Sequence, residues 1–431
     1  MINQVQDVQT RLARILLLTD RYAPSIGGVE RQCSILAKEF TRRGSKTMIV
    51  TDRYLLSLPS SEQDDGIGIY RIGSLSFLRH YLKKYVASMN RVHSKSNGPA
   101  VPGSTRNELH GPLKYIRIFY RLMFYKLPIM VFGVTIIIAL VRHRKEYDVI
   151  QVLQTHWLAY PAVVAGLILT KPVVAREASI NALDALDDFP FKDHTKRMVL
   201  QHCHFVALSN SIFKNLIARG VSPEKIAAIP NAVHLAPQDQ RTIDAPLSVL
   251  FIGNVLNDPL QKGLDLLLHA WQCIVKEIPE ARLTIVGDGD YSDFVAIAKE
   301  LGILHRVTFF GVSLNINSLF CSHNIFVLPS RYEGMSNALL EAMSFGKACL
   351  VTAISGSDDV ITHGINGLKV EPEDVSALAD ALLFLLEHDS EAKAFGNSAR
   401  EYVRMHHSPA KISQQYLNLY THVLEDSKVP S

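Results

Sequence analysis

The sequence has few cysteines, and they show no pairing pattern. The five, which lie far apart and without C-x-x-C spacing, are Cys33, Cys203, Cys273, Cys321 and Cys349. An odd and scattered set argues against a disulfide framework and is typical of reduced, buried thiols. We therefore expect a protein of the reducing cytoplasm.

The sequence also lacks an obvious export signal and a membrane-spanning run. Its first residues carry no basic region before an apolar one, as a signal peptide requires. The most apolar stretch, residues 127–141, holds roughly fifteen residues and is interrupted by Pro128, whereas a spanning helix needs about 20. A buried or interfacial helix is predicted there.

A strong charge of one sign is missing as well. The net charge is +4 over 431 residues, which gives no reason to expect a nucleic-acid partner. Charged residues make up 20% of the chain and hydrophobic ones 48%, as in a folded enzyme with two to three domains.

The first half of the chain shows a strand, a glycine-containing loop and a helix in succession. Residues 14–19 form an apolar run, Gly27 and Gly28 follow, and apolar positions with helical spacing extend to Phe40. A second strand is predicted at residues 47–51. This βαβ pattern is typical of nucleotide-binding folds, in which glycines let a ligand approach the start of the helix.

A second α/β pattern begins after a polar segment at residues 235–246. Strands are predicted at residues 247–252, 283–286, 307–310, 325–328 and 349–352, separated by helices. Such alternation predicts a parallel sheet covered on both faces. Two domains of this kind would face a central cleft, with ligands at the carboxyl ends of the strands.

The segment from Pro329 to Met343 carries the most specific chemistry. Glu333 lies in a loop after a buried strand, Ser336 or Asn337 is suited to cap the next helix, and Glu341 follows one turn beyond Asn337. Amides at a helix start favour an anion, and a carboxylate can accept two hydrogen bonds from a ribose diol. A capped surface helix with solvated glutamates is the alternative.

With these motifs in order, the chain resembles the retaining glycosyltransferases of family 4, also described as glycosyl transferases group 1, most strongly at residues 249–389. The resemblance implies the GT-B fold, an α/β architecture of two Rossmann-like, doubly wound parallel-sheet domains. It implies an acceptor-side domain at 1–238, a donor-binding domain at 239–407, and a last segment, 408–431, that crosses back to the first domain.

The resemblance also implies roles for single residues. Glu333 and His156 would face the donor sugar, Glu341 would hold the ribose, and Lys262 would bind the phosphate. The remaining donor-binding positions would be Gly27, Gly28, Gly263, Gly287, Gly334, Met335, Ser336 and Asn337.

Two positions depart from the family pattern. Asn254 stands where relatives usually have an arginine, and Arg176-Glu177 stands where they often have His-Gly. Either another arginine such as Arg331 replaces the missing cation, or Lys262 suffices, or donor binding is weakened. The role of Arg176-Glu177 is open.

We expect no cofactor and no catalytic metal. Asp288-Gly289-Asp290 matches the D-x-D pattern of metal-dependent glycosyltransferases, but so short a match is weak and we interpret the segment as a glycine turn. The residues of His202-Cys203-His204 are too close in sequence for all three to bind one zinc ion.

Membrane contact is a further hypothesis. The basic positions Lys114, Arg117 and Arg121 share one helical face and precede the apolar run, which suits docking at the inner membrane surface as well as an ordinary solvated helix.

The sequence thus predicts an enzyme that transfers a sugar from a nucleotide-sugar donor to a glycan or lipid-linked acceptor. One alternative is a catalytically impaired nucleotide-sugar-binding regulator or assembly protein, which Asn254 and Arg176-Glu177 motivate. A nucleotide-sugar epimerase of similar architecture is less consistent with the two-glutamate segment.

Overall fold

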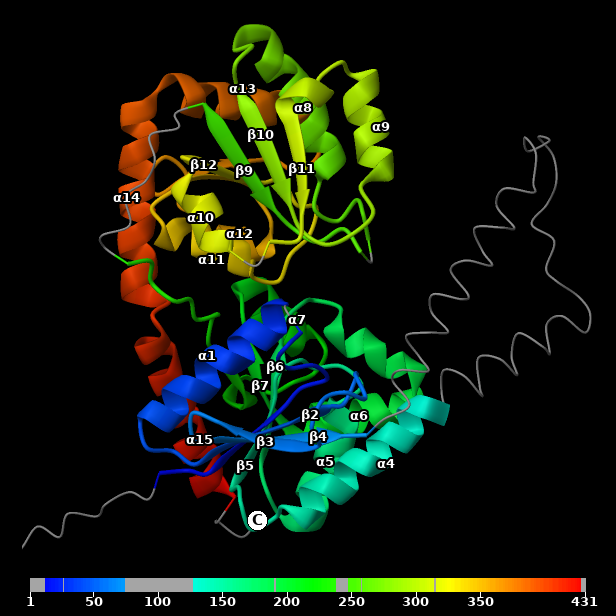
Figure 1. Ribbon diagram of the computed structural model, residues 1–431. Helices are drawn as coiled ribbons and strands as arrows, with labels where there is room; N and C mark the ends of the chain where they lie inside the picture. The colour runs from blue at the N-terminus through cyan, green and yellow to red at the C-terminus, as the bar shows by residue number, and fades with distance from the viewer. Residues whose placement is uncertain are drawn as a thin grey trace, which may run out of the picture.

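The chain folds into two α/β domains, each built around its own sheet (Figure 1). The computed structural model describes residues 12–25, 27–73, 127–189, 191–237, 247–256, 258–313 and 315–427. The basic positions 114–121, together with the other residues from 74 to 126 that precede the apolar run, therefore lie outside the described residues. The inner strands of both sheets are buried and largely apolar, as expected where helices cover both faces.

Within the described residues, the first sheet has eight strands in the order β3-β4-β2-β1-β5-β6-β7-β8. Its pairs are parallel except β3–β4, which is antiparallel. The strands are β1 (Ile15–Leu18), β2 (Thr47–Asp52), β3 (Ser61–Asp64), β4 (Ile67–Ile72), β5 (Val149–Val152), β6 (Val173–Glu177), β7 (Cys203–Ala207) and β8 (Ile226–Ala228).

The helices of this domain connect successive strands. They are α1 (Gly28–Arg42), α4 (Leu127–Arg142), α5 (Ala159–Leu169), α6 (Lys192–His202) and α7 (Asn210–Ala218). Helix α1 places Cys33, Leu36 and Phe40 against the sheet, which confirms the helical spacing in the sequence. The α4 helix packs beside α5 at the outer side of the domain (Figure 1).

In the part of the chain that the structure describes, the second sheet has six parallel strands in the order β11-β10-β9-β12-β13-β14. The strands are β9 (Ser248–Ile252), β10 (Arg282–Val286), β11 (Val307–Gly311), β12 (Ile325–Leu328), β13 (Ala348–Thr352) and β14 (Leu368–Val370). The helices are α8 (Leu264–Glu277), α9 (Ser292–Glu300), α10 (Ile316–Cys321), α11 (Asn337–Ser344), α12 (Ser355–Asp358), α13 (Val375–Glu387) and α14 (Asp389–His406).

The final helix, α15 (Pro409–Asp426), packs against α1 of the first domain (Figure 1). Tyr416 and Tyr420 are buried with their rings edge-on to Phe40, and the Tyr420 hydroxyl donates to Gln151 Oε1 at 3.0 Å. The chain's last helix is thereby part of the first domain's core. The domain limits 1–238 and 239–407, with 408–431 crossing back, stay a prediction.

Among the described residues, no helix combines the length and apolar character that crossing a membrane requires.

Candidate active site between the two domains

The predicted helix after Glu333 begins at the junction of the two domains. Strand β12 ends at Leu328, and Ser336 caps α11 by accepting a hydrogen bond from the Leu339 amide at 3.3 Å. Ser336, rather than Asn337, is therefore the cap. The helix ends just before Gly346, whose φ of 67° suits a glycine stop.

Asn337, the first residue of α11, joins the two domains. Its Oδ1 accepts hydrogen bonds from Gln32 Nε2 at 3.0 Å and from Asn231 Nδ2 at 2.9 Å, and its Nδ2 donates to the Gly28 carbonyl at 3.0 Å. A Cβ atom at Gly28 would lie 2.8 Å from that Nδ2. The absence of a side chain at Gly28 therefore lets the start of α1 meet the start of α11.

Glu341 faces the first domain from the next turn of α11. Its Oε1 forms an ion pair with Nη1 of Arg31, and the two side chains are 19% and 35% exposed. The carboxylate that the family resemblance assigns to the ribose is therefore occupied by a cation from the opposite domain.

Glu333 is likewise turned inward and paired. Its Oε1 forms an ion pair with Lys262 Nζ and lies 3.4 Å from the Ser330 hydroxyl. The Glu333 and Lys262 side chains are 13% and 17% exposed. The structure thus brings the predicted sugar-facing carboxylate and the predicted phosphate-binding lysine into direct contact.

The glycines of the predicted donor site allow close backbone approaches. A Cβ at Gly263 would lie 1.9 Å from the Pro329 carbonyl oxygen, and one at Gly287 would lie 2.1 Å from that of Gly253. Gly263 also has a φ of 65°, a conformation that favours glycine. These loops could not pack as they do around larger residues.

Gly334 makes the corresponding approach across the domain junction. A Cβ there would lie 1.7 Å from the Ala178 carbonyl oxygen of the loop after β6. The next residue, Met335, is 8% exposed and accepts hydrogen bonds from Asn231, at its sulfur and at its carbonyl, each at 3.3 Å. Both residues therefore hold the domains together at the start of α11.

His156 lies in the first domain after β5 and is 7% exposed. Its Nδ1 accepts a hydrogen bond from the Leu158 amide at 3.3 Å, and its Nε2 lies 3.9 Å from Asp20 Oδ2. The ring stacks on Trp157 with centroids 5.4 Å apart. An acceptor role for Nδ1 leaves the proton of the neutral ring on Nε2, the nitrogen that faces Asp20.

Asn254, at the place of the missing arginine, ties two loops together. Its Oδ1 accepts a hydrogen bond from the Asp288 amide at 2.9 Å, which links the loop after β9 to the glycine turn after β10. In the same turn, Asp290 Oδ1 accepts from the Ser292 amide at 3.0 Å and so serves the start of α9.

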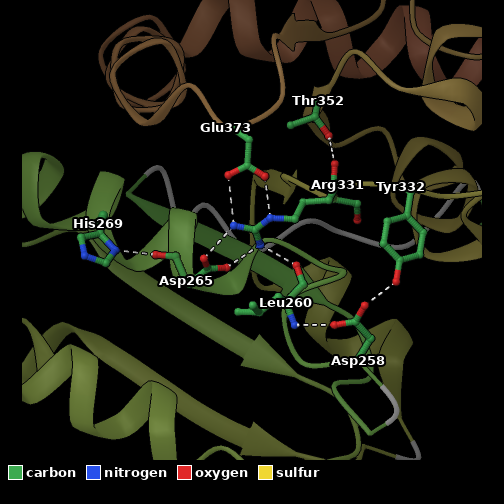
Figure 2. Close-up of polar contacts among 9 residues, drawn as sticks. Asp258, Leu260, Asp265, His269, Arg331, Tyr332, Thr352 and Glu373 are labelled. Atoms are coloured by element: carbon green, nitrogen blue, oxygen red, sulfur yellow. Dashed lines mark hydrogen bonds and ion pairs between the residues drawn. The ribbon is translucent and has the colours of Figure 1, made fainter. Parts of the chain in front are cut away.

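Arg331, the predicted substitute cation, is held by two carboxylates (Figure 2). Its guanidinium binds Asp265 through two bonds of 2.8 Å and Glu373 at 2.6 and 3.2 Å, and it donates to the Leu260 carbonyl at 2.5 Å. These hydrogen bonds, that to Asp265 first, raise the pKa of Arg331. The guanidinium ties the loop after β12 to α8, and these bonds use all five of its N–H donors.

Arg176 and Glu177, whose role the sequence left open, point into the protein. Arg176 donates to the Leu153 carbonyl at 2.9 Å and to Asn231 Oδ1, and thus orients the asparagine that reaches Asn337. Burial lowers the Arg176 pKa. Glu177 is 2% exposed, and burial raises its pKa to about 8 despite the nearby Thr155 hydroxyl and Leu183 amide.

Sequence reasoning missed the residues that complete this junction from the first domain: Arg31, Gln32 and Asn231. Arg31 and Gln32 lie just after the paired glycines, so polar residues directly after that turn were an available signal. Asn231, which follows Pro230, lies at no feature that was recognised in the sequence. Among the residues that the structure describes, no group of three or more potential metal ligands gathers.

Comparisons with known proteins agree with this architecture. The family described as glycosyl transferases group 1 matches residues 246–388. The N-acetyl-alpha-D-glucosaminyl L-malate synthase of Bacillus anthracis is 34% identical over 168 residues, which are 39% of this chain and 44% of that protein. An uncharacterized glycosyltransferase of Methanocaldococcus jannaschii is 23% identical over 96% of this chain and 99% of its own.

Solved structures match over nearly the whole chain. Anabaena HepE, crystallised with UDP, superposes with a TM-score of 0.67 at 17% identity, covering 95% of this chain and 100% of its own. Sucrose-phosphate synthase from Thermosynechococcus elongatus gives 0.68 at 18% identity, with 96% and 100% covered. At these identities the likeness establishes the fold.

The fold is that of the GT-B glycosyltransferases, and the chain is similar in sequence to proteins described as glycosyltransferases. The match to the family of glycosyl transferases group 1 lies within the second of the two domains.

Proposed function

We propose that this protein transfers a sugar from a nucleotide-sugar donor to a glycan or lipid-linked acceptor, with retention of anomeric configuration and without a catalytic metal. The observation that carries the proposal is the segment that leads into α11, where Glu333 pairs with Lys262 and Glu341 pairs with Arg31 across the junction. Solvated glutamates on an ordinary surface helix would not be 13% and 19% exposed in this way.

Each residue of the junction has a role in this proposal. Lys262 and the first amides of α11 bind the diphosphate, because a cation and helix-start N–H groups favour an anion. Glu341 accepts hydrogen bonds from the ribose hydroxyls. Glu333 and His156 bind the donor sugar, and the donor's phosphate separates Lys262 from Glu333.

The transfer step breaks the bond between the anomeric carbon and the phosphate oxygen and forms one between that carbon and the acceptor oxygen. In the proposed same-face attack, the acceptor proton passes to the leaving phosphate. Negative charge then grows on the diphosphate, where Lys262 and the α11 amides stabilise it. Closure of the junction excludes water and limits hydrolysis.

The proposal needs no resident metal because protein groups supply the positive charge at the phosphate. Asp290, one of the two D-x-D carboxylates, serves the start of α9. We expect EDTA to leave the rate of transfer unchanged.

The experiment incubates the protein with UDP-, GDP- and ADP-sugars, together with candidate glycan and lipid-linked acceptors, and measures nucleotide release and sugar transfer. Product NMR then reads the anomeric configuration. We expect transfer with one donor class. Glu333→Gln should abolish transfer, whereas Lys393→Gln, the control at an exposed position of α14, should change it little. An inverted product refutes retention, and the absence of both binding and transfer across the panel refutes the proposal.

Asn254 favours a second candidate, an impaired enzyme that binds nucleotide sugars as a regulator or assembly partner, because its amide stands where an arginine would contact phosphate. Tight donor binding without transfer by any acceptor would support this candidate.

We also propose contact with the inner membrane surface through α4. Met130, Val131, Val134 and Ile138 are 40 to 61% exposed along this helix, and basic residues follow at Arg142, Arg144 and Lys145. An exposed apolar face beside basic groups suits an anionic bilayer. Flotation with anionic liposomes at low salt tests this, and we expect it to be lost in a Val134→Asp, Ile138→Asp variant; flotation that these changes do not affect places the contact elsewhere.

A further inference from the structure

The ion pair between Arg31 and Glu341 links the first turn of α1 to the second turn of α11 across the domain junction. It lies beside the contacts that Asn337 makes with Gly28 and Gln32. The two helices thus meet start to start, each bringing one partner of the pair. Arg31 is thus a cation of the first domain in direct contact with the carboxylate assigned to the ribose.

This pairing conflicts with the proposed role of Glu341. A carboxylate that accepts two hydrogen bonds from a ribose diol needs both oxygens, and Arg31 takes Oε1. Donor binding must therefore break or rearrange the pair. Removing the carboxylate from a partly buried guanidinium costs free energy unless the guanidinium gains another anion.

The donor itself would bring that anion. In the proposed function the diphosphate sits at the start of α11, which the start of α1 also faces. This part of the site is short of cations, because Asn254 replaces an arginine and Arg331 is bound to Asp265 and Glu373. An arginine suits the task, since its planar fork can hold two phosphate oxygens.

We propose that Arg31 is a donor-binding residue that occupies the ribose carboxylate while the site is empty and turns to the donor diphosphate when the ribose takes Glu341. The inference rests on the proposed function and adds to it the second phosphate cation. It also makes donor binding require the first domain, so that an open arrangement of the domains binds the diphosphate more weakly.

The test compares ligands that differ only in phosphate. Binding of UDP, UMP and uridine, with the guanine and adenine series in parallel, is measured by calorimetry and, for the weak nucleosides, by ligand-observed NMR. The variants are Arg31→Gln, Arg31→Lys, Glu341→Gln and the control Arg42→Gln. Arg42 lies on the same helix, is 66% exposed and pairs with Glu39 of its own helix.

We expect Arg31→Gln to weaken binding of the diphosphate by roughly ten- to a hundredfold, which corresponds to the loss of one charge-assisted hydrogen bond. Nucleoside binding should stay the same or tighten, because Glu341 no longer has to leave Arg31. Arg31→Lys should fall between Arg31→Gln and the wild type. Glu341→Gln should weaken the nucleoside as well as the diphosphate, because it removes the ribose contact. Arg42→Gln should bind all ligands like the wild type.

Two results would overturn the role of Arg31. If Arg31→Gln loses the same affinity for the diphosphate and the nucleoside, Arg31 only stabilises the domain interface. If its diphosphate binding is unchanged or tighter, the ion pair only holds the domains together before the donor binds. Circular dichroism of each variant shows that it is folded. A wild type that binds none of the ligands would instead refute the proposed function.

Discussion

Replacing Arg331 tests whether this arginine supports the donor domain or binds the donor. Arg331→Ala removes two 2.8 Å bonds to Asp265 and leaves that carboxylate, 20% exposed, without its cation. The Arg331 bonds to Glu373 add less, because Glu373 is 58% exposed. We expect a loss of about 2–3 kcal/mol, between the values of exposed and fully buried pairs.

Tryptophan fluorescence can follow this loss in one domain. The chain has two tryptophans, and Trp271 is fully buried in α8, the helix that carries Asp265. In a Trp157→Phe background, urea unfolding followed at Trp271 reports the second domain alone. A change of this size in a domain of about 150–250 residues corresponds to a fall in melting temperature of roughly 4–12 °C.

The effect should depend on pH. Burial opposes ionisation of Asp265, but the hydrogen bonds and charge of Arg331 outweigh it and lower the pKa of this carboxyl. A carboxyl whose pKa is lowered by folding stabilises the protein at pH values above its unfolded pKa of about 3.9. This stabilisation is lost as the pH falls through the folded pKa. The difference between wild type and Arg331→Ala should therefore be constant near neutral pH and shrink below about pH 4.

The matched control is Arg404→Ala, which removes an exposed pair within α14. If Arg331→Ala unfolds at the same urea concentration as Arg404→Ala, the supporting role is wrong. If Arg331→Lys keeps its stability but loses diphosphate affinity, Arg331 belongs to the donor site.

Three further predictions concern the first domain and the junction. Asn337→Ala loses three hydrogen bonds between the domains, so we expect a larger radius of gyration in small-angle scattering and about 1–3 kcal/mol lower stability; an unchanged radius would contradict this. Glu177, with its pKa raised to about 8, favours the protonated form when folded, so the wild type should lose stability as pH rises from about 4.3 to 8. Glu177→Gln should flatten that slope in calorimetry, and an equal slope would refute the assignment. Gly28→Val should abolish turnover with an unchanged circular dichroism spectrum, because its side chain would meet Asn337, and preserved kinetics would remove Gly28 from the site.

The alternation of strands and helices in the second domain was predictable because its strands are short apolar runs bounded by polar or glycine-rich turns. Ile325–Leu328 is the strand that the sequence indicated, and Asp374 caps α13 through the Ala377 amide at 2.8 Å. The edge strand β3 was not predicted, since all four of its side chains are exposed and show no apolar alternation. The turn that follows it, Asp65-Gly66 with both φ values positive, was the local signal available.

The candidate site was predictable one element at a time. Helix-start residues, glycines and carboxylates each carry a local pattern, and the structure brings Glu333 to Lys262 and Glu341 to the junction. The contacts across the junction could not be predicted in this way. The Arg31–Glu341 pair joins residues 310 positions apart, and no local pattern specifies it. Likewise, nothing near Arg331 in sequence indicates that Asp265 and Glu373 bind it.

The docking of α15 on α1 has a consequence for how the protein is made. Tyr416 and Tyr420 fill the layer beside Phe40, so a nascent chain on the ribosome cannot finish folding its first domain until Tyr420 has been translated. Premature termination anywhere before Tyr416 would therefore damage the start of the polypeptide as well as its end.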